Sequence, residues 1–133
     1  MKYLLDSNTC IQFLNETHAG VKQRFFAQLP SDLAICSIVK AELIYGAYRS
    51  ERVAANLQRL AIFFEPLRCL PFDDACVQTY GQLRAVLAAK GAAIGANDML
   101  IAAIALTHRL AVVTHNTREF SLVDGLKLVD WEI

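Results

Sequence analysis

Short apolar runs alternate along this chain with longer segments whose apolar residues recur at helical spacing. The short runs are mostly continuous rather than alternating, as expected for strands that are covered on both faces. They predict five strands, at Tyr3–Leu5, Leu33–Cys36, Leu67–Leu70, Ala111–Thr114 and Leu126–Val129. The predicted helices are Thr9–Leu14, Val21–Gln28, Ile38–Tyr48, Arg52–Phe63, Asp74–Lys90 and Asp98–His108. Strands that alternate with helices predict an α/β fold with a parallel sheet between helical layers.

Residues at the helix ends agree with these boundaries. Ser37, Asp73 and Asn97 stand where N-caps are expected, because their side chains can accept hydrogen bonds from free amides of the first turn. Gly91 follows a predicted helix at the place where a C-terminal glycine is common. The segment after Asp98 is apolar on nearly every side, which predicts a helix buried in the core.

Length and composition favour one domain, which we expect to span residues 1–133. The chain is 55% hydrophobic and 20% charged, and its 133 residues suit a single core. No apolar run reaches the roughly 18 residues of a membrane span, and the opening MKYLLDSN meets an acid too early for a signal peptide. The four cysteines form no C-x-x-C pair, which favours structural cysteines over a zinc or redox motif. We therefore expect a cytoplasmic protein that does not bind membranes.

The formal net charge of +0 removes the usual sign of a nucleic-acid binder, which is a strongly basic domain. A nucleic-acid substrate would have to be held by a local basic patch or through metal ions. Six arginines could contact phosphates, although charges on helices usually face water. They are Arg24, Arg49, Arg52, Arg59, Arg84 and Arg118.

Polar residues follow the first and fourth predicted strands, and ligands of such sheets bind at the carboxyl ends of strands. Asp6 comes directly after the first strand, where it could also cap the next helix. Asn116 and Glu119 follow the fourth strand, where they could instead form an Asx turn and a solvated charge. His115 could act as a general base, but its surroundings in the sequence show no partner that would orient it.

Two further acids have unusual surroundings. Glu42 has Ile38, Val39, Tyr45 and Gly46 at the helical spacings that share its face. A carboxylate on such a face needs a cation, which could be a buried arginine or a metal ion. Asp98 opens the apolar helix, where the helix dipole favours an anion. Because Asn97 is already expected to cap that helix, Asp98 exceeds what capping requires.

These acids predict a divalent-metal site if the fold brings them together. Two carboxylates about 4 Å apart repel by roughly 4 kcal/mol at an effective dielectric constant of 20, so three or four require protons or a cation. Oxygen ligands without histidine or thiolate suit Mg²⁺ or Mn²⁺ rather than zinc. Such ions activate water and stabilise the charge of an in-line displacement at phosphorus.

Four segments of the chain resemble the signatures of PIN-domain ribonucleases, most closely the VapC-type toxins of bacterial toxin–antitoxin pairs. The segments are LLDSN, SIVKAELIYGA, GANDMLIAAIAL and VVTHNTREF, in that order between Tyr3 and Trp131. The resemblance implies a three-layer α/β/α domain with a five-stranded parallel sheet. It also implies hydrolysis of RNA phosphodiester bonds with Mg²⁺ or Mn²⁺.

The resemblance assigns roles to individual residues. Asp6, Glu42 and Asp98 match the acidic positions of the family, with Asp6 and Asp98 as the principal metal ligands. Glu119 matches the fourth acidic position, and the choice between Glu119 and Asn116 as the fourth site residue stays open. The supporting residues are Asn116 beside the site, Thr114 behind it, and Ser7 where the family often has threonine. The implied partners are an RNA substrate, a small antitoxin, a second copy of the chain, and operator DNA through the antitoxin complex only.

Two other classes of function fit parts of the pattern. An aspartyl phosphatase also has Asp after its first strand, but it generally needs a second Asp two residues later, where this chain has Asn8. A receiver-like domain usually has a lysine after its last strand, and no lysine here stands clearly in that place. A PIN-like module that only binds would be expected to have lost one or more acids, and this chain retains all of them.

Overall fold

The computed structural model describes all 133 residues and contains one five-stranded sheet in which every neighbouring pair of strands is parallel. The strand order is β3-β2-β1-β4-β5. The strands are β1 (Tyr3–Leu5), β2 (Leu33–Cys36), β3 (Arg68–Leu70), β4 (Ala111–Val113) and β5 (Leu128–Val129). The predicted α/β/α architecture with five parallel strands is therefore confirmed.

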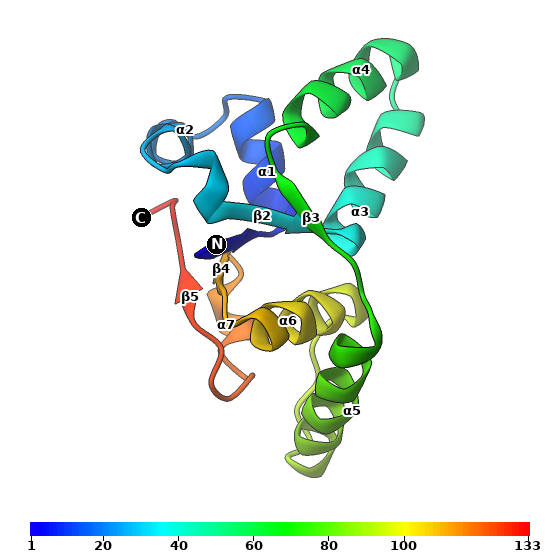
Figure 1. Cartoon of the computed structure of the whole chain (residues 1–133), viewed down its shortest axis with the longest axis vertical. Coiled ribbons are helices and arrows are strands. Elements are labelled where there is room, and N and C mark those ends of the chain that lie inside the picture. Colours follow the sequence, from blue (N-terminus) through cyan, green and yellow to red (C-terminus); the bar gives the residue numbers. More distant parts are fainter.

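The helices form two layers on the sheet. They are α1 (Ser7–Leu14), α2 (Ala19–Phe26), α3 (Ser37–Tyr48), α4 (Val53–Phe64), α5 (Asp74–Ala89), α6 (Ala96–His108) and α7 (Thr117–Phe120), with a short 3₁₀ turn at Pro30–Asp32. Right-handed crossovers place α1 to α4 on one side and α5 to α7 on the other, because the chain moves in opposite directions from β1 and from β4 (Figure 1). No helix is long and apolar enough to cross a membrane.

The core is continuous between the sheet and both layers. The central strands β1 and β2 bury almost all of their side chains, and so does the middle of α6 from Ile101 to Ala105. The prediction that the apolar helix behind Asp98 lies in the core is thus confirmed. Cys10, Cys36 and Cys76 are buried and none of the four cysteines is in a disulfide, as expected for structural cysteines.

The predicted caps are right at one helix and wrong at two. The Asp73 Oδ1 accepts a hydrogen bond from the Cys76 amide at 3.2 Å and caps α5 as predicted. Ser37 and Asn97 are not caps, because each lies inside its helix. Helix α6 begins one residue earlier than Asn97 and its N-cap is Gly95, whose carbonyl accepts from the Met99 amide at 2.9 Å. Gly91 has a positive φ of 67° just after α5, as expected for a glycine that ends a helix.

We expect Asp73→Ala to lower the free energy of unfolding by about 1 kcal/mol, because α5 loses its only side-chain cap. Ser37→Ala is the matched comparison, since Ser37 is exposed and lies one residue inside α3. It should change stability by less than about 0.5 kcal/mol. Urea denaturation of both variants measures the difference. Equal losses would contradict the assigned caps.

One helix was not predicted, and the fourth strand is shorter than expected. Helix α7 has only four residues, which is too short for its apolar spacing to be detected in the sequence. Strand β4 ends at Val113, so Thr114 lies just beyond it. The Thr114 amide still donates to the Val129 carbonyl at 2.9 Å, which keeps this residue fixed to β5.

Candidate active site

The candidate site lies at the carboxyl ends of β1 and β4, where the strand order reverses direction. The chain leaves β1 towards β2 on one side and leaves β4 towards β5 on the other, so the segments that follow these two strands diverge at this point of the sheet. Such a switch point leaves a crevice in which parallel α/β sheets bind their ligands. Asp6 follows β1 and Thr114 follows β4, and the Asp6 amide donates to the Val113 carbonyl at 3.1 Å.

Asp6 is a buried carboxylate that caps a helix. Its Oδ1 accepts a hydrogen bond from the Thr9 amide at 2.8 Å and so caps α1, which confirms the simpler of the two interpretations. The residue is only 5% exposed, and burial is the main reason that its pKa is raised above the ordinary value. Hydrogen bonds from Thr114 and Thr9 oppose this shift, and the nearby charge of Glu42 adds to it. The cap does not prevent Asp6 from binding a ligand, because its other carboxylate oxygen takes no part in the cap.

Glu42 lies one turn into α3, and its Oε1 accepts a hydrogen bond from the Ser7 hydroxyl at 2.8 Å. No arginine or lysine forms an ion pair with it, so of the two alternatives left open by the sequence the buried arginine is excluded. Its helix face is also less buried than the pattern suggested, because Tyr45 is exposed one turn further on. Glu42 is half-buried and therefore reachable from solvent.

Asp98 is in the first turn of α6, directly before the buried part of that helix. Its pKa is raised to about 6, first by burial and then by the charges of Glu119 and Asp6. Glu42 contributes in the same direction, so the other three predicted acids all act on Asp98. Because α6 begins at Ala96 and has no side-chain cap, the argument that Asn97 makes Asp98 unnecessary for capping is wrong. The proximity of the other three acids is the stronger reason to assign Asp98 to a site.

Asn116 lies between Asp98 and the fourth acid, Glu119, and hydrogen-bonds to both. Its Nδ2 donates to the Asp98 Oδ2 at 3.2 Å and to the Glu119 Oε2 at 3.0 Å. The Thr114 hydroxyl accepts from the Asn116 amide at 3.0 Å, which orients the start of α7. Glu119 also accepts from the Gly95 amide, and these two contacts lower its pKa. The structure thus brings both candidates for the fourth site residue to Asp98.

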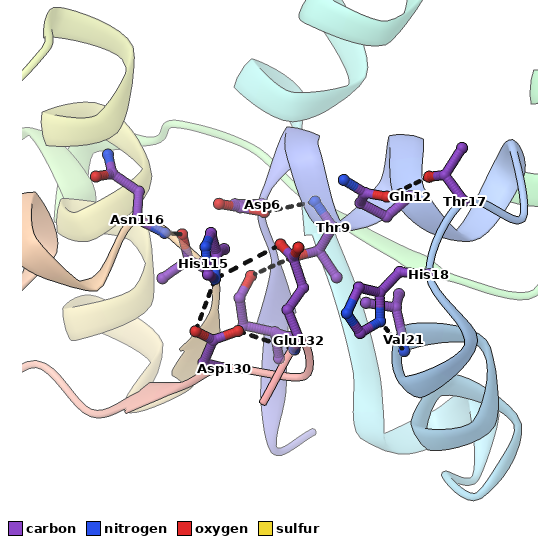
Figure 2. A network of polar contacts seen from close by, with 12 residues as sticks. Asp6, Thr9, Gln12, Thr17, His18, Val21, His115, Asn116, Asp130 and Glu132 are labelled. Atoms are coloured by element: carbon purple, nitrogen blue, oxygen red, sulfur yellow. Dashed lines mark hydrogen bonds and ion pairs between the residues drawn. The ribbon is translucent and has the colours of Figure 1, made fainter.

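A neighbouring group was missed in the sequence. The His115 Nδ1 lies 2.9 Å from the Asp130 Oδ2 and 3.8 Å from the Glu132 Oε2 (Figure 2). The statement that His115 lacks a partner is therefore wrong, and the hydrogen bond to Asp130 raises its pKa. These residues lie after β4 and β5, and only the parallel pairing of the two strands brings them together. The imidazole is mostly exposed, as suits a charged surface network.

The donor set fits a hard divalent cation. All four acids offer oxygen atoms, and no lysine or arginine pairs with any of them. Asp6 and Asp98 both have raised pKa values, mainly because of burial, and neighbouring carboxylates add to both shifts. No three of these carboxylates have oxygens within 4.8 Å of one another, so an ion with several water ligands suits the pocket. Mg²⁺ commonly keeps several waters in this way.

We expect the metal-free protein to be less stable at pH 7.5 than at pH 5. The Asp98 pKa rises from 3.8 to about 6 on folding, so the folded state binds this proton more tightly. Its contribution to stability is complete below pH 3.8 and is lost as the pH rises through about 6. Asp6 acts in the same direction, and so does exposed His115 at higher pH.

Thermal unfolding in EDTA at the two pH values measures this effect. Asp98→Asn should reduce the difference in Tm, whereas Asp124→Asn, whose carboxylate pairs with Lys90 on the surface, should leave it unchanged. A metal-free Tm that increases from pH 5 to pH 7.5 would contradict the expectation.

Oxygen-only acidic groups at the switch point of a parallel α/β/α sheet are typical of metal-dependent hydrolases that act on phosphate esters. Comparison with known proteins identifies the family within this class. The model of the PIN domain family matches residues 3–126, so the chain belongs to the PIN-domain family, in which its relatives are VapC ribonucleases. PIN-domain nucleases generally use divalent metal ions.

The similarity to curated relatives covers almost the whole chain. It is 38% identical over 131 residues to the tRNA(fMet)-specific endonuclease VapC of Shigella flexneri, with 98% of each chain covered. It is 37% identical over 134 residues to Ribonuclease VapC2 of Rickettsia felis, with 99% of each covered.

Solved structures agree. DNA-bound VapBC from Salmonella typhimurium contains a chain that superposes with a TM-score of 0.92 at 38% identity, covering 98% of both chains. VapBC2 from Rickettsia felis, bound to a DNA fragment from its promoter, gives a TM-score of 0.90 at 36% identity and covers 98% of this chain and 99% of that one. The resemblance inferred from four sequence segments is confirmed.

Proposed function

We propose that this chain, acting as one domain, is a Mg²⁺- or Mn²⁺-dependent endoribonuclease and the toxin of a toxin–antitoxin pair. The observation that carries the proposal is the group of Asp6, Glu42, Asp98 and Glu119 at the switch point, with two raised pKa values and no cationic side chain. Membership of a nuclease family supports the same activity. We also propose that it acts in the cytoplasm, where its substrate would be found.

Asp6 and Asp98 would hold the principal metal ion. When bound, such an ion stabilises the negative charge of the reacting phosphate and activates a water molecule. Glu42, oriented by the Ser7 hydroxyl, completes the pocket or positions the attacking water. Glu119 assists while Asn116 keeps its carboxylate beside Asp98, and Thr114 supports both Asp6 and Asn116.

We propose tRNA as the class of substrate, because the Shigella flexneri relative is a tRNA(fMet)-specific endonuclease. The proposed partners are a small antitoxin and a second copy of this chain, with operator DNA bound only through the antitoxin complex. The solved VapBC relatives that are bound to DNA support the antitoxin and DNA part of this proposal.

End-labelled initiator tRNA and total tRNA, incubated with purified protein free of antitoxin, test the activity. We expect discrete cleavage products with Mg²⁺ or Mn²⁺ and none with EDTA. A catalytically inert binding module would bind the tRNA and leave it intact under both conditions. Intact tRNA and intact total cellular RNA with every divalent ion tried would overturn the proposal.

A further inference from the structure

A groove of about 560 Å³ opens beside the acidic pocket, between α1, α3 and α4. Ser7 and Glu42, which are hydrogen-bonded to each other, line this groove, and so does Asn97, the residue before Asp98. The groove therefore adjoins the group of acids at the switch point. Figure 1 shows α3 and α4 lying side by side next to α1, on the side of the sheet opposite α5 and α6.

The groove is apolar at its base and polar at its rim. Leu43, Ala47 and Leu60 are buried side chains that line it from below. The rim carries amide side chains, including those of Asn8 and Asn15. Apolar surface with a few hydrogen-bonding groups is typical of sites for small planar ligands, and it suits the flat faces and polar edges of a nucleobase.

Tyr45 lines the groove one helical turn beyond Glu42, on the same side of α3. It is 62% exposed, so its ring is accessible from the groove. The Arg49 guanidinium lies 5.5 Å from the centroid of its ring. Exposed aromatic rings combined with arginine are what proteins use to bind single-stranded nucleic acid.

The charges around the groove suit a phosphate backbone. Arg59 also lines it and donates to the Asn15 Oδ1 at 3.4 Å. Neither Arg49 nor Arg59 forms an ion pair with a carboxylate. Both guanidinium groups are on exposed residues and remain available to phosphate oxygens. In a chain with a net charge of +0, they supply the local basic character that RNA binding requires.

We propose that this groove is a nucleobase-binding subsite in which Tyr45 stacks on a base of the RNA close to the scissile phosphate. The proposal rests on the ribonuclease activity proposed above and adds to it a residue that positions the substrate. Stacking requires an unpaired base, so the subsite favours single-stranded or looped RNA over a duplex. Stacking alone tolerates any base, while the amides at the rim can discriminate between base edges.

Binding of two octamers tests the subsite independently of cleavage. The probes are fluorescein-labelled octa-adenylate and a ribose-phosphate octamer of equal length without bases, both measured by anisotropy in the cleavage-deficient Asp98→Asn background. Tyr45→Ala should weaken binding of octa-adenylate about tenfold, because one base–aromatic stack is lost. The same substitution should leave binding of the base-free octamer unchanged, and Tyr45→Phe should retain the affinity for octa-adenylate.

Tyr48→Ala is the matched control. Tyr48 is 63% exposed on the same helix but does not line the groove, so its loss should change neither affinity. Equal weakening of both octamers by Tyr45→Ala would assign Tyr45 to the backbone and overturn the subsite, as would no weakening of either. Unchanged octamer binding together with loss of a co-expressed antitoxin would instead make the groove a protein-docking site. Failure of the wild-type protein to cleave tRNA would overturn the proposed function without altering these affinities.

Discussion

Asp98→Asn is expected to lower the rate of RNA cleavage about a thousandfold, because it weakens binding of the metal ion, and loss of one preorganised group that stabilises a developing negative charge has effects of this size. The substitution exchanges a carboxylate for a neutral amide of nearly the same shape, so it removes a proposed metal ligand without leaving a cavity. The side-chain oxygen of the substituted residue can still accept the hydrogen bond that Asn116 donates. Single-turnover cleavage of labelled tRNA with saturating Mn²⁺ measures the loss.

The same substitution should raise the Tm of the metal-free protein. Burial and the charges of Glu119, Asp6 and Glu42 all disfavour the ionised form of Asp98, and its pKa of about 6 reflects this. A neutral amide removes the repulsion at pH 7.5. The combination of lower activity with higher metal-free stability distinguishes a ligand from a structural residue, whose loss would lower both.

Asp124→Asn is the control for this experiment, because Asp124 pairs with Lys90 at the surface and has no contact with the acidic pocket. It should retain full activity. Asp6→Asn should abolish cleavage in the same way, since the amide oxygen can still cap α1 while the charge is lost. Full activity of Asp98→Asn would remove Asp98 from the site.

The sequence was sufficient to predict the sheet because its strands are short, apolar and separated by well-marked helices. Each predicted strand overlaps an observed one, and β1 and β2 agree at both ends. Strands that are buried on both faces appear in the sequence as continuous apolar runs. Such a run can be recognised from only a few residues. Helix ends were harder to predict because several residues near each end can serve as caps. Gly95 caps α6 through its backbone alone, which leaves no side-chain signal in the sequence.

The position of a candidate site residue was predictable where it directly follows a strand or opens an apolar helix, as Asp6 and Asp98 do. Contacts between segments that are distant in the sequence could not be predicted. The hydrogen bond from Ser7 to Glu42 joins residues 35 positions apart, and the His115 contact with Asp130 depends on the pairing of β4 with β5. For Glu42 the sequence left an arginine partner and a metal ion as alternatives, because residue spacing shows which side chains share a helix face but not what covers that face.

Phe120→Ala is expected to lower the free energy of unfolding by about 3–5 kcal/mol, the range for removing a buried aromatic side chain. Phe120 is fully buried and is the only buried residue of α7. A helix of four residues has no stability of its own, so packing of this ring must hold it against the core. Urea denaturation measures the cost, and Leu122→Ala, at a side chain that is 41% exposed in the same segment, should cost under about 1 kcal/mol.

The position of α7 links this packing to the site. Glu119 precedes Phe120 directly, and the Phe120 amide donates to the Asn116 carbonyl at 3.3 Å. If the ring fixes α7, Phe120→Ala should also reduce cleavage under conditions in which the variant is still folded, because Asn116 and Glu119 are no longer held beside Asp98. A variant that loses stability but cleaves at the wild-type rate would show that the polar contacts of Asn116 are sufficient to hold these residues. If Phe120→Ala changed neither the free energy of unfolding nor the cleavage rate by much, the ring would not anchor α7.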